Sequence, residues 1–461
     1  MKFLDTAFEK FSKKKPVSVM LRATIENTLS AARLDRLFDD HAEEQYAGDL
    51  LFSTVADLMG EVVLNIQPSI NSAWRERKVE IGVTVKSVYD KLQGIEIGVS
   101  RALVRDTSQR MAAIIKQLGC QPAPLIAGYR TKIVDGNHLR RTDRRIGELR
   151  EQNVAPLPGK SLVVLDPQLR LAIDVLPCQD GHAQERSLFG EMLETVEPDD
   201  MWVGDRNFCT VGCLFGIGQR RAKFVMRQHG SLPYELKGRR RLVGETETGK
   251  VYEQAMSVTN SAGETRNFRR IEVQLDEPTR DGDESVFLVT NLPKRISALL
   301  IADVYRNRWT IETAFQEMAE NLEGEIQTLG YPKAALFGFC MALVSFNLMS
   351  VIRAAVGSRH GEEAAETFSM YYACNEVSQT QEGMSVVLPN PFWQNRYGSL
   401  TPTQMAAELK RLAGNIDLQK YRKNKWKKKP KPPAKTKKNR KHASTFKILE
   451  EARNKQTTTA K

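Results

Sequence analysis

Cysteine is scarce in this chain, which has six among its 461 residues. The six are scattered through apolar surroundings, a distribution typical of buried thiols in a reducing cytosol rather than of a disulfide framework. Cys209 and Cys213 are four positions apart, but no second pair of Cys or His stands near them to complete a zinc site. The cysteines therefore exclude a secreted disulfide scaffold and give no sign of structural zinc.

Long hydrophobic runs are also missing, since no uninterrupted apolar stretch reaches the length of about 18 residues that a membrane span needs. The nearest candidate, residues 334–356, is interrupted by Gly, Ser, Asn and Arg, and we interpret it as a buried core helix. Residues 1–15 lack an apolar stretch of signal-peptide length. The sequence therefore predicts a cytoplasmic protein without a membrane partner, associated with the nucleoid if it binds DNA.

Most of the chain has almost no net charge, although the total is +12, from 68 basic and 56 acidic residues. Residues 420–461 hold 17 Lys and Arg against two Glu, a net charge of +15, and the other 419 residues carry −3. Because prolines interrupt this lysine-rich run, its composition predicts a disordered tail. Its simplest function is sequence-independent attraction to DNA, and the alternatives are a solubilising or RNA-binding tail.

The hydrophobic pattern changes near residue 126. Before it, apolar residues recur at helical spacing, which predicts an all-helical region with a helix ending at Gly119. After it, short runs rich in Val, Ile and Leu predict three strands, then helix, strand, helix and strand. The strands are expected at Ile133–Val134, Ser161–Leu165, Leu171–Leu176, Met201–Gly204 and Ala222–Arg227, and the helices at Leu188–Val196, capped by Ser187, and Thr210–Gln219. This order indicates a mixed sheet covered by helices.

The second half of the chain interrupts this alternation and then returns to it. Residues 231–284 predict a β-rich insertion, followed by a strand at Val286–Thr290 and one long helix from Ser297 to about Leu322. A further helix is expected to begin at Thr401. The predicted units are a helical N-terminal domain (1–125), a mixed-sheet core in two parts (126–230 and 285–356), the β-rich insertion (231–284), a helical C-terminal region (357–419) and the basic tail (420–461).

Three acidic residues stand out. Asp135 ends the first predicted strand and Asp205 ends the fourth, and since these strands can be neighbours, we expect the two carboxylates at one edge of the sheet. Glu312 lies among apolar residues of the long helix, where a carboxylate is costly unless a charge or a metal compensates it. Asp166 and Asp174 also lie beside strands. We interpret Asp166 as a turn former and Asp174 as a candidate partner for a core Arg.

Converging carboxylates without His or Cys suit a hard cation such as Mg²⁺, which takes oxygen ligands and keeps several waters. Two such ions about 4 Å apart can activate a water or a 3′-hydroxyl and stabilise the leaving oxygen of a phosphodiester. Phosphoryl transfer needs little more from a protein than acids and basic positioning groups. The alternative is structural, because Asp at a strand end is often a turn former or a helix cap, and Asp135-Gly136 is a common turn dipeptide.

Tyr305, Arg308 and Glu312 have the spacing Y-x(2)-R-x(3)-E. This resembles the signature of bacterial DDE transposases of the insertion-sequence-four type, whose fuller form adds a Lys seven residues after the Glu. The segments 134–139 and 203–208 are similar to the surroundings of that family's first two acids, and the resemblance covers about residues 126–356. The family's Lys position falls on Ala319 here, so that cationic contact is absent or comes from elsewhere, for example Lys294 or Arg295.

The resemblance implies an α/β fold with an RNase H-like mixed-sheet catalytic core, interrupted by a β-rich insertion before its last acid-bearing helix. It implies cut-and-paste transposition, in which a homodimer pairs two terminal inverted repeats of double-stranded DNA, and a freed 3′-hydroxyl finally joins target DNA. Asp135, Asp205 and Glu312 would hold two Mg²⁺ or Mn²⁺ ions. Tyr305 and Arg308 match positions that hold phosphates beside the cleavage site.

Further DNA contacts are expected from Arg206, Trp309 and three basic clusters. For Trp309, core packing on the helix is the alternative to contact with a displaced base. The clusters comprise Arg140, Arg141, Arg144, Arg145 and Arg150; Arg220, Arg221, Lys223 and Arg227; and Lys237, Arg239, Arg240 and Arg241. Two rival functions use the same core: a structure-selective nuclease that cuts without joining, and a domesticated DNA-binding protein, which Ala319 favours.

Overall fold

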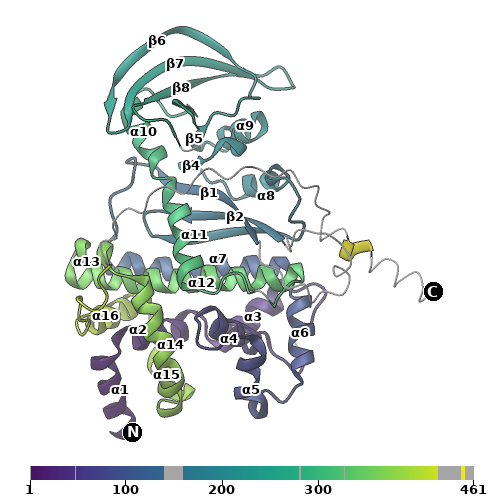
Figure 1. The fold of residues 1–461 in the computed structure, drawn as a ribbon, viewed down its shortest axis with the longest axis vertical. Helices are drawn as coiled ribbons and strands as arrows, with labels where there is room; N and C mark the ends of the chain where they lie inside the picture. The colour runs from purple at the N-terminus through teal and green to yellow at the C-terminus, as the bar shows by residue number, and fades with distance from the viewer. Residues whose placement is uncertain are drawn as a thin grey trace.

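The computed structural model describes residues 2–46, 48–139, 159–279, 282–326, 328–423 and 448–451. A large β-sheet stands above two long helices, α7 and α12, and most of the remaining helices form a layer below them (Figure 1). The mixed α/β architecture predicted from the sequence is confirmed. The tail beyond Lys423 and the cluster that begins at Arg140 lie almost wholly outside the described residues.

The N-terminal region is helical throughout its described residues, as its periodicity predicts. Helix α7 ends at Gly119, which adopts the left-handed conformation (φ 66°) that closes a helix at little steric cost to glycine. The helices are α1 Lys2–Lys14, α2 Pro16–Thr28, α3 Ala31–His41, α4 Phe52–Val63, α5 Ile70–Ile81, α6 Val85–Gly94 and α7 Ile97–Leu118.

A nine-stranded sheet, in the described part of the chain, has the order β3-β2-β1-β4-β5-β9-β8-β7-β6. Strands β4 and β5 run parallel to β1, whereas β2, β3 and β9 to β6 join through antiparallel pairs. The strands are β1 Arg130–Leu139, β2 Gly159–Asp166, β3 Leu171–Cys178, β4 Asp200–Gly204, β5 Lys223–Arg227, β6 Glu235–Thr246, β7 Gly249–Thr259, β8 Thr265–Leu275 and β9 Ser285–Thr290. The predicted strands are thus confirmed, most with longer bounds.

Strands β6 to β8 extend the central sheet instead of forming a separate one. Strand β9 pairs with β5 on one side and with β8 on the other, so that both of its edges are hydrogen-bonded. Residues 235–275 therefore continue the same hydrogen-bonded ladder (Figure 1).

Short helical segments and the longer helix α9 lie along the chain between β3 and β5. They are η2 Glu185–Leu188, α8 Phe189–Glu194, η3 Arg206–Phe208 and α9 Val211–Gln219. Thr210 caps α9 by accepting a hydrogen bond from the Cys213 N–H (3.3 Å). The predicted cap at Ser187 is wrong: Ser187 lies inside η2, and its hydroxyl donates to the carbonyl of Gln184 instead. Together α8 and α9 bury one face of the sheet in an apolar cluster that includes Trp202.

The long helix predicted from Ser297 is two helices, α10 Ala298–Arg306 and α11 Trp309–Asn321. Ser297 caps the first by accepting from the Leu300 N–H (3.1 Å), as predicted. The helix stops at Asn307, whose side-chain amide donates to the carbonyl of Asp303. Arg308 therefore stands at a break between two helices and not in the middle of one.

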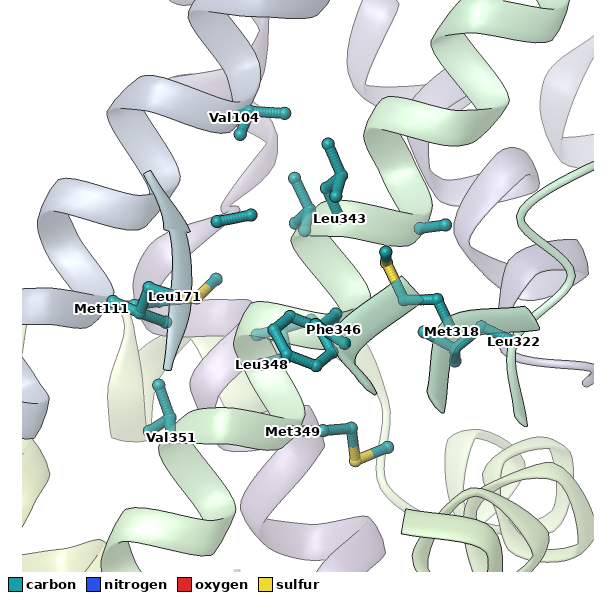
Figure 2. Packing of buried hydrophobic residues seen from close by; sticks show 14 of the residues in the cluster. Val104, Met111, Leu171, Met318, Leu322, Leu343, Phe346, Leu348, Met349 and Val351 are labelled. Carbon is teal, nitrogen blue, oxygen red and sulfur yellow. The ribbon is translucent and has the colours of Figure 1, made fainter. Parts of the chain in front are cut away.

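Helix α12 (Pro332–His360) forms the centre of the core. The helix is long and apolar enough to span a membrane, with a mean hydropathy of 2.1 in its most apolar 18-residue window. However, 94% of that window is buried inside the protein. Figure 2 shows Leu343, Phe346 and Met349 of α12 among side chains of α7, β3 and α11. The interpretation of residues 334–356 as a core helix is confirmed by this burial.

The remaining helices complete the lower layer around α12. They are α13 Glu362–Thr367, α14 Met370–Val387, α15 Asn390–Tyr397 and α16 Pro402–Ala413. Thr401 and Gln404 form a capping box at the start of α16, where the sequence predicts a helix to begin. Helix α11 packs on α12 and α14, so the core fixes the helix that carries Glu312.

Asn347 is a buried amide in this apolar helix. Fully buried, it donates from Nδ2 to the carbonyl of Ala172 and accepts at Oδ1 from the Ala172 N–H, both at 2.8 Å. Strand β3 lies at the edge of the sheet, and its register shifts next to Ala172. The amide therefore supplies the partners that a neighbouring strand would otherwise provide.

We expect Asn347→Leu to lower the free energy of unfolding by about 2–5 kcal/mol, because two buried backbone groups lose their partners. Urea denaturation of the purified chain measures this. Ser350→Ala is the control, since its hydroxyl bonds only the carbonyl of Phe346 within the same helix, and it should cost less than about 1 kcal/mol. Equal effects of the two substitutions would contradict the role of Asn347.

Candidate active site at the ends of β1 and β4

Asp135 and Asp205 lie side by side at one edge of the sheet. Strands β1 and β4 pair in parallel with Val134 opposite Gly204, and each acid directly follows one of these paired residues. The prediction that the first and fourth strands are neighbours is confirmed. Asp135-Gly136 is not a turn, because β1 continues through both residues and stays paired with β2 as far as Leu139.

Asp205 leaves its strand and begins a turn. Its Oδ1 accepts a hydrogen bond from the Asn207 N–H (2.8 Å), which caps the short helix η3. The capping interpretation therefore holds for Asp205. The cap uses one carboxylate oxygen and leaves Oδ2 without a hydrogen-bond partner among the described residues.

Arg308 joins the first acid to the third. Its Nη1 lies 3.3 Å from Asp135 Oδ2 and its Nη2 lies 2.7 Å from Glu312 Oε1. The helix break sets this geometry, because Arg308 precedes α11 while Glu312 lies in the first turn of α11. One guanidinium thus lies between two carboxylates that are far apart in the sequence.

Glu312 is not enclosed by apolar residues, so the expectation of a buried carboxylate is wrong. Its side chain is 46% exposed. Helix α11 buries Ile311, Ala314 and Met318 on one face, and Glu312 lies on the other. The apolar neighbours in the sequence belong to the opposite face of the helix.

The electrostatics of the site favour an added cation. Burial raises the pKa of Asp135 to about 7; the Arg308 guanidinium opposes this shift, and the charges of Asp205 and Glu312 add to it. Burial also raises the pKa of Asp205, against the effect of its hydrogen bond from Asn207. One guanidinium therefore leaves the negative charge of the three acids only partly compensated.

The donor set fits a hard divalent cation, since it offers carboxylate oxygens and neither thiol nor imidazole. Within the described residues, however, no group of three or more His, Cys, Asp and Glu side chains is gathered closely enough to hold an ion. Arg308 occupies the space between Asp135 and Glu312. Closing the acids around a metal therefore requires the guanidinium to withdraw.

Tyr305 and Trp309 flank Arg308 in different ways. The Tyr305 ring lies 5.8 Å from the guanidinium carbon, and burial raises the pKa of its hydroxyl. Trp309 is 63% exposed at the start of α11, which rules out core packing as its role. A large exposed indole beside the acids is available for contact with a ligand.

The predicted basic contacts are only partly brought to the site. Arg206 is exposed directly after Asp205. Arg140 and Arg141, with the rest of their cluster, lie outside the described residues. Arg227 pairs with Asp283 (2.6 Å), and Arg240 pairs with Glu272 (2.7 Å), so these two side chains are already engaged within the protein.

The two competing acids are structural, as their sequence contexts suggest. Asp166 accepts from the N–H groups of Gln168 and Leu169 in a turn. Asp174 forms a two-pronged pair with Arg101, with both contacts at 3.0 Å.

Glu185, Asn207 and His138 also lie at this edge, and sequence reasoning missed all three. The Asn207 amide donates to Glu185 Oε2 (3.0 Å), and His138 Nε2 lies 3.7 Å from Glu185 Oε1. Glu185 follows a turn-rich segment and carries no periodic or motif signal. Only the proximity of Asn207 to Asp205, and of His138 to Asp135, could have drawn attention to them.

Comparison with known proteins finds similarity in this region. Residues 127–344 match the protein family described as transposase DDE domain. A putative transposase of Sinorhizobium fredii is 29% identical over 132 residues, which are 28% of this chain and 35% of the relative; the chain thus spans about a third of that curated relative. A cryo-EM structure of the piggyBac transposase synaptic complex with hairpin DNA aligns over 89% of this chain and 85% of its own, at 11% identity and a TM-score of 0.37.

Proposed function

We propose that this protein is a DNA transposase of the insertion-sequence-four type, which cuts DNA at terminal inverted repeats and joins the freed ends to target DNA. The observation that carries the proposal is the acid set within the segment that matches the DDE family. Asp135 and Asp205 directly follow the last paired residues of the parallel strands β1 and β4, and Glu312 is linked to Asp135 through Arg308. These residues belong to the spacing Y-x(2)-R-x(3)-E and to the two strand-end motifs.

The strand arrangement supports an RNase H-like core. Strands β1 to β3 form an antiparallel meander, β4 and β5 add in parallel beside β1, and α11 brings the third acid to the end of β1. The insertion, strands β6 to β8, enters between β5 and β9. We also propose that the helical region of residues 1–125 binds the DNA ends.

Asp135, Asp205 and Glu312 would hold two Mg²⁺ or Mn²⁺ ions, which when bound supply an activated water or 3′-hydroxyl and stabilise the leaving oxygen. Arg308, displaced from the two carboxylates, presents a planar pair of donors to the phosphate being cut. Tyr305 limits the directions in which that guanidinium can move, because its ring packs beside it. Arg206 faces solvent beside Asp205, where it can contact the same strand of DNA.

The proposal is tested by incubating the full-length protein with the inverted-repeat ends of its own element and Mg²⁺, and resolving the products on denaturing gels. We expect nicks at the ends and strand-transfer products with a target plasmid. Binding without nicking, or nicking that survives Asp135→Ala, would contradict the catalytic assignment. Nicking of branched DNA without any joining would instead identify a structure-selective nuclease.

Trp309 gives a prediction that separates DNA contact from folding. Trp309→Ala should leave the thermal midpoint within about 1 °C, since the exposed indole packs little, yet lower affinity for an end with an unpaired base by about 5- to 100-fold. Fluorescence anisotropy with paired and unpaired ends measures the difference. Trp393→Ala is a control outside the proposed DNA-binding regions; its buried indole donates to the carbonyl of Leu388, so this substitution should affect stability instead. An equal loss of affinity for both kinds of end would contradict base stacking.

Residues 421–423, at the start of the proposed basic tail, contact the folded protein. The Tyr421 hydroxyl donates to Glu376 in the core, and the Tyr421 backbone carbonyl accepts from the Ser369 N–H (2.7 Å). The Lys423 N–H donates to the carbonyl of Thr367 (2.8 Å). Lys423 also pairs with Glu317 of α11 (3.2 Å). Residues 421–423 are therefore part of the folded protein, and a truncation that spares the fold must follow Lys423.

We expect a chain that ends at Lys423 to keep its thermal midpoint and its preference for inverted-repeat ends, but to bind random DNA with a flatter dependence of log K on log salt. Each neutralised phosphate contributes about −0.9 to that slope. Filter binding between 50 and 200 mM salt, roughly the range over which such contacts are lost, measures it. Loss of end preference on truncation would show that the tail takes part in specific recognition.

The active form is proposed to be a homodimer on the two DNA ends, and the protein to act in the bacterial cytoplasm at the nucleoid. Analytical ultracentrifugation with and without end DNA tests the first statement: a complex with one chain and two ends would contradict it.

A further inference from the structure

Around Asp135, strand β1 has a second face that the proposed chemistry does not use. Asp135 points toward Arg308, whereas Gly136 and His138 alternate to the opposite side of the strand. The carboxylate of Glu185 lies on that side. A Cβ on Gly136 would fall 2.4 Å from Glu185 Oε1, so a glycine is needed at this position for Glu185 to occupy its place.

Glu185 contacts the turn of Asp205 as closely as it contacts the strand of Asp135. The Asn207 side chain donates to Glu185 Oε2 (3.0 Å), while the backbone N–H of Asn207 caps Asp205 Oδ1 (2.8 Å). Asn207 thus connects the two carboxylates, and its orientation depends on Glu185. Through Gly136 and Asn207, one side chain touches the neighbours of both strand-end acids.

An ordinary surface role does not account for these contacts. An acid in the first turn of η2 could be a solvated residue favoured by the helix dipole. The Glu185 side chain is instead only 15% exposed. His138 and Asn207 hold its pKa below the usual range, so it is a carboxylate at neutral pH, placed near Asp205, whose own pKa its charge helps to raise.

We propose that Glu185 is a positioning residue of the catalytic site, which holds Asp135 and Asp205 at a fixed separation by bracing Gly136 and orienting Asn207. The inference rests on the proposed function, because it concerns the two acids assigned there to the metal ions. Groups that orient metal ligands in this way typically alter metal affinity by about 10- to 100-fold when removed.

The test measures Mn²⁺ binding to the full-length, DNA-free protein by isothermal titration calorimetry, and the metal concentration that gives half-maximal nicking. Glu185→Ala and Asn207→Ala should each raise the Mn²⁺ dissociation constant about tenfold. Asn207→Ala keeps the backbone cap on Asp205 and removes only the amide, so it reports on the contact with Glu185. Glu185→Gln keeps an oxygen for the Asn207 amide and should stay within about threefold of the parent.

Gly136→Ala supplies an independent approach. The new methyl group must push the Glu185 carboxylate away, and we expect a rise in the dissociation constant similar to that of Glu185→Ala. In the Glu185→Ala background the space is open, so the double variant should bind Mn²⁺ no more weakly than Glu185→Ala alone. Glu194→Ala, an exposed acid on α8, is the matched control and should leave binding unchanged.

The outcomes separate this inference from the proposed function. If Asp205→Ala weakens Mn²⁺ binding while Glu185→Ala and Gly136→Ala alter only the thermal midpoint, the positioning role is overturned and the metal site stands. If Glu185→Gln is as severe as Asp205→Ala, Glu185 is itself a ligand and the positioning role is also overturned. If Asp205→Ala has no effect on Mn²⁺ binding, the metal site fails, and this inference fails with it.

Discussion

Replacing Asp135 with asparagine should abolish DNA nicking by at least about 10³-fold and, at the same time, stabilise the metal-free protein at pH 8. The loss of activity follows because the carboxylate is an assigned metal ligand and an amide binds Mg²⁺ poorly. The gain in stability follows because the folded protein holds this carboxyl in a buried site beside two other acids, which raises its pKa to about 7.

The sign of the stability effect depends on pH. A carboxyl whose pKa is higher in the folded than in the unfolded chain stabilises the fold below about pH 4, where both states are protonated at no cost, and this contribution is lost as pH rises through about 7. The substituted amide does not ionise, so Asp135→Asn should match the parent near pH 4 and exceed it at pH 8. We expect a gain of about 1–3 kcal/mol, since one pKa unit corresponds to about 1.4 kcal/mol and the partly exposed Asp135 side chain keeps some contact with water.

Chemical denaturation in EDTA at about pH 4 and pH 8, together with a nicking assay, measures both effects. Asp174→Asn is the matched control from the same sheet, because it breaks the buried pair with Arg101 and should destabilise the protein by about 3 kcal/mol without altering Mn²⁺ binding. A loss of stability in Asp135→Asn at pH 8 would show that the acid is held by structural contacts, as Asp174 is.

Arg308→Ala should change metal binding and catalysis in opposite directions. The guanidinium lies between Asp135 and Glu312 and competes with a cation for both carboxylates, so its removal should tighten Mn²⁺ binding to the DNA-free protein several-fold. The same substitution removes the proposed phosphate contact and should lower the nicking rate by about 10²–10³-fold at saturating metal.

Calorimetry and single-turnover nicking separate the two effects of Arg308. Arg308→Lys keeps the charge but not the paired donors, so it should bind Mn²⁺ like the parent and still nick slowly. Weaker metal binding in Arg308→Ala would mean that the guanidinium organises the acids for the ion, which is the reverse of the competition expected here.

The positions of Asp135 and Asp205 could be predicted because they follow from local signals and one simple rule. Each acid ends a short run of Val, Ile and other apolar residues, and two parallel neighbours in a sheet place their carboxyl ends together. The core helix α12 could be predicted as well, since its composition allows only a buried or a membrane environment.

The geometry of Arg308 could not be predicted in the same way. The apolar pattern from Ser297 onward is continuous, because α10 and α11 each bury one face, so it indicates a single helix. The break at Asn307 places Arg308 beside Asp135, which lies 173 positions earlier in the chain. A local sequence pattern cannot predict a contact between residues so far apart. The exposure of Glu312 was misjudged for the same reason, since it depends on which face of α11 meets α12.

Contacts between distant segments also explain the other misses. Glu185 accepts a hydrogen bond from Asn207, which follows β4, and its carboxylate lies against Gly136 of β1. The predicted disordered tail includes Tyr421, which Glu376 fixes in the core. The composition predicts disorder for the tail as a whole, whereas a tertiary contact fixes the position of its first residues.

The central position of α12 has a consequence for how the protein is made. The ribosome completes all nine described strands and helix α7 before it adds residue 332, which takes roughly 20–60 s at about 5–20 residues per second. Until α12 emerges, the apolar faces of α7, β3 and α11 have nothing to cover them. A chain cut short before that point is therefore expected to aggregate or be degraded, because these apolar faces stay exposed. Early-terminated copies are not expected to accumulate beside the complete protein.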